Sequence, residues 1–116
     1  MISDMPRKSD MIDIDAMQIQ ANKATSVLSA MCNEKRLMIL CQLIDGERTV
    51  NELAELVGAA QPTVSQHLGL LRREGLINVR HDGRTHFYTL AGNEAREILG
   101  TLQSLYCDPT SKDSKK

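Results

Sequence analysis

The chain has 116 residues, which suits one small domain, and its net charge of −1 argues against a polycation that binds nucleic acid by charge alone. Hydrophobic residues make up 41% and aromatic residues only 3%, so the core must be built from aliphatic side chains and methionine. We see no signal peptide and no apolar run of membrane length, and therefore expect a cytoplasmic protein without membrane contacts. Three cysteines in a reducing compartment favour metal or redox chemistry over a structural disulfide framework.

Both ends of the expected domain, residues 13–107, carry apolar stripes with helical spacing. Residues 1–12 are polar and aperiodic, which predicts a mobile N-terminal arm, and residues 108–116 lack apolar side chains, which predicts a disordered tail. The stripes run through Ile14, Met17, Ala21, Ala24, Leu28 and Met31, and through Ala91, Ala95, Ile98, Leu102 and Leu105. Such seams are typical of helices that pack on another helix, either in a dimerisation layer or over the core of their own chain.

A short helix is expected after Asn33, which can cap its first turn. The apolar face of this helix would consist of Leu37, Leu40, Cys41 and Ile44. Asp45-Gly46 would end the helix and turn the chain toward the next one.

Residues 49–75 have the pattern of a helix-turn-helix. Thr49 and Glu52 can form a capping box at the start of the first helix, and Gly58 suits the left-handed residue that ends it. Pro62 suits the first position of the second helix, where its missing N–H costs nothing, and Gly75 suits the end of that helix. The inward positions of the second helix would be Val64, Leu68 and Leu71.

The remaining positions of the second helix carry hydrogen-bonding side chains. Short or amide-bearing groups can read base edges, and arginines can hold phosphates, although a solvated helix would show the same polar face. The base-reading candidates are Gln61, Thr63, Ser65, Gln66 and His67. The candidates for contacts to the DNA backbone or minor groove are Arg72, Arg73, Arg80, His81 and Arg84.

A β-hairpin is predicted directly after this second helix. Its alternating or returning apolar residues are Ile77, Val79, Phe87, Tyr88 and Leu90. Asp82-Gly83 is a type I′ turn signal. Residues 61–90 also carry four arginines against two acidic residues, a net charge of +2, whereas residues 1–60 carry −3. About five helices and a two-stranded wing therefore predict a mostly α winged helix-turn-helix domain that binds double-stranded DNA.

The chain resembles the ArsR family of bacterial transcriptional repressors in four stretches. These read EKRLMILCQL, TVNELAELVG, QPTVSQHLGLLRREGLI and GRTHFYTL, and the resemblance covers about residues 16–107. The elements S-Q-H-L and L-R-x-x-G-L-[IV] are the most specific. The resemblance implies a homodimer that represses transcription from an inverted-repeat DNA operator.

Cys41 and Cys107 resemble the sensing thiols of the persulfide-responsive subgroup of this family. This implies that the reduced dimer represses, and that reactive sulfur species (persulfides and polysulfides) release it by linking the two thiols, thereby controlling sulfide-response genes. From the residues alone, Cys41 could instead be a buried hydrophobic residue. Cys32 precedes a helix start with Lys35 and Arg36 nearby, an environment that favours a reactive thiol, so it is at least as reactive a candidate.

The sequence offers little support for a metal site or a catalytic site. ELAELV, before the second helix of the helix-turn-helix, lacks the C-x-C pair of metal-sensing relatives, and the last helix carries Glu94 and Glu97 without a histidine. We therefore expect no metal and no cofactor, although ligands from two subunits would still permit a metal-responsive repressor. Without a C-x-x-C motif or a glycine-rich phosphate loop, we expect no enzyme. A general thiol/disulfide switch and an architectural DNA-binding protein remain alternatives.

Overall fold

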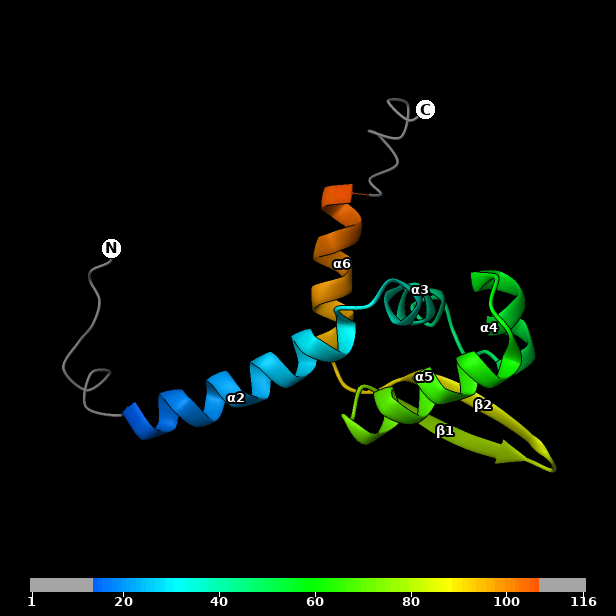
Figure 1. Ribbon diagram of the computed structural model, residues 1–116, viewed down its shortest axis with the longest axis horizontal. Coiled ribbons are helices and arrows are strands. Elements are labelled where there is room, and N and C mark those ends of the chain that lie inside the picture. The colour runs from blue at the N-terminus through cyan, green and yellow to red at the C-terminus, as the bar shows by residue number, and fades with distance from the viewer. Residues whose placement is uncertain (1–13, 107–116) are drawn as a thin grey trace.

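The computed structural model describes residues 14–106, which form five helices and a two-stranded antiparallel hairpin (Figure 1). In chain order these are α2 (Ile14–Met31), α3 (Glu34–Gln42), α4 (Val50–Val57), α5 (Gln61–Arg73), β1 (Ile77–Asp82), β2 (Thr85–Leu90) and α6 (Glu94–Tyr106). This order confirms the predicted winged helix-turn-helix fold. The expected N-terminal arm, the expected tail and Cys107 lie outside the described residues.

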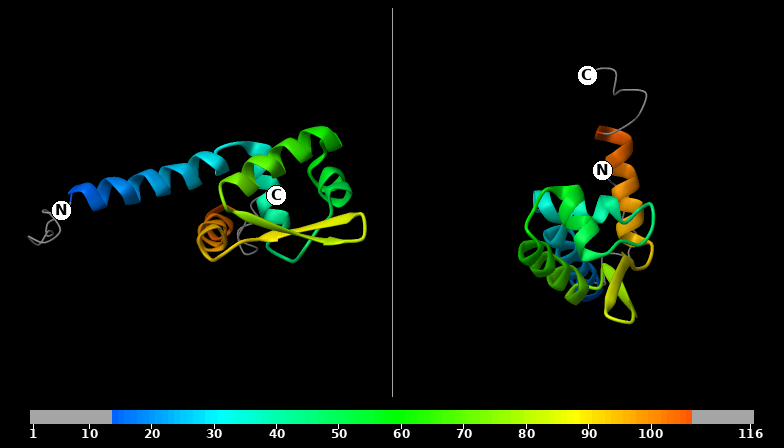
Figure 2. Two further views of the ribbon diagram at one scale, coloured as in Figure 1. Left: turned by 90° about the horizontal axis from the view of Figure 1, so that it is seen from below. Right: turned by 90° about the vertical axis from the view of Figure 1, so that its right-hand side faces the viewer.

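α2 is a long helix that leaves the rest of the molecule on the side opposite the hairpin (Figures 1 and 2). Only its last two residues, Ala30 and Met31, are buried, whereas Met17 in its first half is 60% exposed. The far end of α6 is also uncovered, since Leu105 is 65% and Tyr106 79% exposed. Apart from Met31, which joins the core, the large apolar side chains of the α2 seam and those at the end of α6 therefore do not cover the core of their own chain.

The core lies between α3, α4, α5, the base of the hairpin and the first turns of α6. Its largest fully buried side chains are aliphatic: Ile39, Leu40, Leu43, Leu53, Val64, Leu68, Leu71, Ile77 and Leu99. All three predicted inward residues of α5 belong to this set, so the helix is oriented as its pattern predicted. In α6 the buried pair is Ala95 and Leu99, and α6 begins at Glu94, so the seam predicted from Ala91 is wrong at its start.

The predicted helix caps are present. Asn33 Oδ1 accepts a hydrogen bond from the Arg36 amide at 3.0 Å, and Thr49 and Glu52 form both bonds of the capping box. Gly58 ends α4 with a φ of 67°, a left-handed conformation that costs glycine little. α5 begins at Gln61, so Pro62 occupies the second helical position rather than the predicted first, where its missing N–H is still harmless.

Basic side chains tie α3 to its neighbours. Lys35 Nζ donates to the carbonyl of Val57 at 2.8 Å, so a cation satisfies the C-terminal end of α4, where carbonyls lack helical partners. Arg96 Nη1 donates at 3.2 Å to the carbonyl of Ile44, just beyond α3. These bonds hold α3 against the first helix of the helix-turn-helix and against α6.

The hairpin pairs β1 with β2 from Ile77 and Leu90 at its base to Asp82 and Thr85 at its tip. Its loop is Gly83-Arg84, so the expected type I′ turn on Asp82-Gly83 is wrong. Gly83 has a φ of 66°, and no non-glycine residue among those described has a positive φ, which is the type II′ pattern with glycine first. Arg84 consequently lies at the tip of the wing.

A further segment pairs with the hairpin just before α4. Arg48 and Tyr88 exchange two backbone hydrogen bonds, with N–O distances of 3.1 and 2.9 Å. Arg48 Nε also donates to the carbonyl of Gln42 at 3.3 Å, at the end of α3. The wing is thus anchored to the segment that leads into the helix-turn-helix.

Candidate nucleic-acid interface

The outer face of α5 displays the predicted base-reading residues. Exposed side chains occupy four of the five positions, at Gln61, Thr63, Ser65 and Gln66, and His67 is half-buried. Gln61 Nε2 donates to Asn51 Oδ1 on α4, a residue that the sequence analysis did not single out. Asn51 thereby orients the amide of Gln61 and extends the polar surface across both helices of the helix-turn-helix.

His67 occupies the edge of this face. Partial burial lowers the pKa of His67, and the positive charge of nearby Arg36 lowers it further. At neutral pH the imidazole is therefore uncharged, with one nitrogen as a donor and the other as an acceptor. Such a side chain can hydrogen-bond a base edge but adds no charge for phosphate.

The predicted phosphate-binding arginines lie at two places. Arg72 and Arg73 are exposed in the last turn of α5, and Arg84 is exposed at the tip of the wing. Both groups follow the recognition face of α5 in the chain, and the ribbon shows α5 and the hairpin side by side (Figures 1 and 2). This arrangement suits a major-groove helix flanked by backbone contacts.

Arg80 is bound within the protein. Its guanidinium donates to both carboxylate oxygens of Glu47 at 2.9 and 2.6 Å and stacks over the ring of Phe87, 4.4 Å from the centroid. The hydrogen bond from Arg80 lowers the pKa of Glu47, which favours the ionised carboxylate that the pair needs. Arg80 therefore braces the wing against the segment before α4, and its predicted contact with DNA would compete with this bond.

We expect the substitution Glu47→Gln to strengthen binding to all DNA duplexes by several-fold. The change removes the carboxylate that binds Arg80 and so releases the guanidinium for contact with the DNA backbone. Fluorescence anisotropy with random-sequence duplexes at several salt concentrations measures this effect. Glu97→Gln on α6 is the matched control for net charge, and equal effects from both variants would contradict a local role for Glu47.

The structure places two of the three cysteines. Cys41 is half-buried on α3 and packs against the hydrophobic core, whereas Cys32 is exposed in the connection between α2 and α3. Cys107 follows Tyr106, the last described residue. The predicted link between Cys41 and Cys107 therefore stays a prediction.

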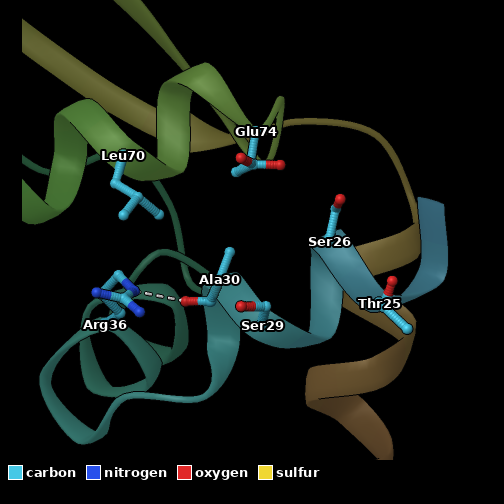
Figure 3. A pocket seen from close by; sticks show the side chains of 7 residues that line it. All are labelled: Thr25, Ser26, Ser29, Ala30, Arg36, Leu70 and Glu74. Atoms are coloured by element: carbon cyan, nitrogen blue, oxygen red, sulfur yellow. Dashed lines mark hydrogen bonds between the residues drawn. The ribbon is translucent and has the colours of Figure 1, made fainter. Parts of the chain in front are cut away.

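A cavity of about 410 Å³ lies behind the recognition helix, between α2, α3 and the end of α5 (Figure 3). Its polar lining comes from Thr25, Ser26, Ser29, Arg36 and Glu74. Arg36 Nε donates to the carbonyl of Ala30 at 2.6 Å, which holds the guanidinium at the rim. The cavity adjoins the C-terminal end of α5 and does not interrupt its base-reading face.

Two kinds of site are absent from residues 14–106. No helix in that range is both long and apolar enough to cross a membrane. Within the same range, no three or more His, Cys, Asp or Glu side chains are grouped so that they could hold a metal ion.

The family model for bacterial regulatory proteins of the arsR family matches residues 33–79, from the start of α3 into the hairpin. The transcriptional activator HlyU of Vibrio cholerae is 43% identical over 96 residues, which cover 83% of this chain and 89% of that protein. The biofilm growth-associated repressor of Xylella fastidiosa is 35% identical over 91 residues, covering 78% of this chain and 80% of the repressor.

Solved structures show the same relationship. Reduced HlyU from Vibrio cholerae superposes with a TM-score of 0.77 at 44% identity, covering 81% of this chain and 99% of that one. The homodimeric winged helix-turn-helix domain of a possible ArsR-family regulator from Mycobacterium bovis has a TM-score of 0.71 at 25% identity, covering 95% and 94%. The chain therefore belongs to the ArsR family of bacterial regulatory proteins and is a winged-helix, DNA-binding regulator of transcription.

Proposed function

We propose that the protein is a homodimeric repressor that binds an inverted-repeat operator and is released when reactive sulfur species link Cys41 to Cys107. The observation that carries the DNA-binding part is the exposed hydrogen-bonding face of α5, with Arg72 and Arg73 at its end and Arg84 on the wing. Two such faces related by a two-fold axis read half-sites about 34–36 Å apart, roughly one turn of DNA.

The uncovered seam of α2 supports the homodimer. Its exposed apolar side chains include Ile14, Met17 and Leu28, and α6 adds Leu105 and Tyr106. A small domain gains stability when such surfaces are buried against a second copy. The Mycobacterium bovis relative, which is described as homodimeric, has the same fold.

Three points support the thiol switch. Cys41 and Cys107 resemble the thiol pair of the persulfide-responsive subgroup, and the HlyU structure is described as reduced, which names an oxidation state for that relative. Cys41 also lies on α3, which Lys35 joins to the end of α4, so a change at this thiol has a short route to the DNA-binding helices. For the sense of regulation we follow the Xylella fastidiosa relative, which is named a repressor, whereas HlyU is named an activator.

Replacing Gln66 with Ala should reduce the preference for operator over random DNA by roughly tenfold, because the exposed amide can read a base edge in the major groove. Arg84→Ala should instead weaken binding to every duplex and reduce the slope of log affinity against log salt by about one unit. Fluorescence anisotropy with operator and scrambled duplexes at several salt concentrations separates the two effects.

A matched control for these variants is Gln103→Ala on α6, which removes the same exposed amide away from the recognition helix. It should change neither sequence preference nor salt dependence. Equal losses on operator and scrambled DNA from both Gln66→Ala and Arg84→Ala would refute the division into base reading and phosphate binding.

A further inference from the structure

Two histidines face each other on the wing. His81 of β1 and His86 of β2 are directly opposed in the antiparallel ladder, and both side chains are exposed. Their ring centroids are 4.2 Å apart, with the ring planes inclined by 38°. The pair takes no part in the recognition face of α5 or in the bond between Arg80 and Glu47.

The hairpin geometry accounts for this close approach. In a hairpin with a two-residue loop, the pair beside the loop, Asp82 and Thr85, is the hydrogen-bonded one, and pair types alternate along an antiparallel ladder. His81 and His86 then form a non-hydrogen-bonded pair, in which side chains lie closest together. Because faces alternate along a strand, Arg80 and Asp82 lie on the other face from the two imidazoles.

We propose that His81 and His86 together bind one divalent transition-metal ion of the Zn²⁺, Ni²⁺ or Cu²⁺ class. Neutral imidazole nitrogens suit these ions, with metal–nitrogen distances of about 2.0–2.1 Å. A tetrahedral ion then needs two nitrogens about 3.3 Å apart. The ring centroids are 4.2 Å apart and both side chains are exposed, so the two rings are close enough for one nitrogen of each to be turned toward a shared ion. Water completes the coordination, because two protein ligands leave positions open.

The position of the ion gives it an effect on DNA binding, which rests on the proposed function. Arg84 lies in the loop, two residues from His86, so the pair is near the tip that would meet the phosphate backbone. A divalent ion there adds positive charge to the wing. If the ion neutralises one or two more phosphates, the slope of log affinity against log salt concentration becomes steeper by about one to two units.

The direct test follows the imidazole resonances of the full-length, metal-free protein by NMR during a Zn²⁺ titration. This readout identifies the binding residues even if Zn²⁺ also meets a thiol. The resonances of His81 and His86 should shift together and saturate at one ion per chain, while those of His67 stay in place. In His81→Asn, the His86 resonances should need at least about tenfold more Zn²⁺ for the same shift, since one ligand is lost.

His67→Asn is the matched control and should leave the titration of the wing pair unchanged. An identical titration of His86 in wild type and in His81→Asn would overturn the site. In anisotropy experiments Zn²⁺ should steepen the salt dependence for wild type but not for His81→Asn. An unchanged dependence despite intact Zn²⁺ binding would refute only the DNA effect, whereas the proposed function is tested separately by the Gln66 and Arg84 variants.

Discussion

Replacing Met17 with Glu is expected to convert the proposed dimer into monomers and to weaken operator binding by about 100-fold to 10,000-fold. Met17 is 60% exposed on the seam of α2, where a second copy would bury it. An unpaired carboxylate buried in a helix–helix interface carries a large desolvation cost. A monomer also binds only one half-site and loses the effective concentration that the linked second recognition helix provides.

Sedimentation velocity measures the oligomeric state of this variant, and anisotropy with full-operator and half-site duplexes measures its DNA affinity. Affinity for a half-site should change little, because the N-terminal half of α2 lies far from α5 (Figures 1 and 2). Asn22→Glu is the matched control, since it adds the same charge at an exposed position on the opposite side of α2. A Met17→Glu protein that remains dimeric at nanomolar concentration would rule out α2 as the interface.

Polysulfide treatment is expected to weaken operator binding of the wild-type protein by roughly 5-fold to 150-fold, the range of a typical allosteric coupling. Cys41→Ser and Cys107→Ser should bind operator with normal affinity and lose this response. Cys32→Ser is the matched control and should keep it, although Cys32 is the more exposed of the two described cysteines. A Cys32→Ser protein that binds DNA without responding would transfer the sensing role to Cys32.

The mass of the modified chain identifies the bridge. Two thiols lose their hydrogens to one zero-valent sulfur, which leaves as hydrogen sulfide, and each further sulfur inserted into the bridge adds its own mass. A direct disulfide needs Cβ atoms about 3.5–4.5 Å apart, and each inserted sulfur extends the reach by up to ~2 Å. Intact mass spectrometry should show added sulfur after polysulfide and little change after peroxide. An equally fast loss of two hydrogens with peroxide would indicate a general disulfide switch.

The features that the sequence predicted well depend on neighbours a few residues apart. The capping box needs only Thr49 and Glu52, and the inward face of α5 follows from helical spacing, so both could be predicted and are confirmed. The predicted start of α6 at Ala91 was wrong, because Gly92 has a φ of 69° and a helix cannot run through that conformation. The helix therefore begins at Glu94, although the apolar spacing begins earlier. Spacing predicts which residues share a face, but the conformation of the chain decides where a helix begins.

Contacts between distant residues could not be predicted. Glu47 and Arg80 are 33 positions apart, and only the fold brings the wing beside the segment before α4. The pairing of Arg48 with Tyr88 is a single bridge, too short to leave an alternating pattern in the sequence. The predicted position of the hairpin turn was wrong by one residue. Gly83 fits either the first or the second central position of a two-residue turn, and the pairing of the strands decides between them.

The hydrogen bond from Lys35 to the carbonyl of Val57 links α3 to the end of α4, directly before the turn of the helix-turn-helix. Val57 directly precedes Gly58, where the chain changes direction toward α5. With the Lys35 side chain held in its conformation, a displacement of α3 away from the end of α4 by more than about an ångström would lengthen this 2.8 Å bond beyond hydrogen-bonding range. The Lys35 ammonium group and the Val57 carbonyl would then need water molecules as hydrogen-bond partners. The loss of this bond therefore opposes a motion of α3 that leaves the end of α4, and the start of α5 beyond it, in place. Lys35 thus links α3, the helix that carries Cys41, to the turn that leads into the recognition helix α5.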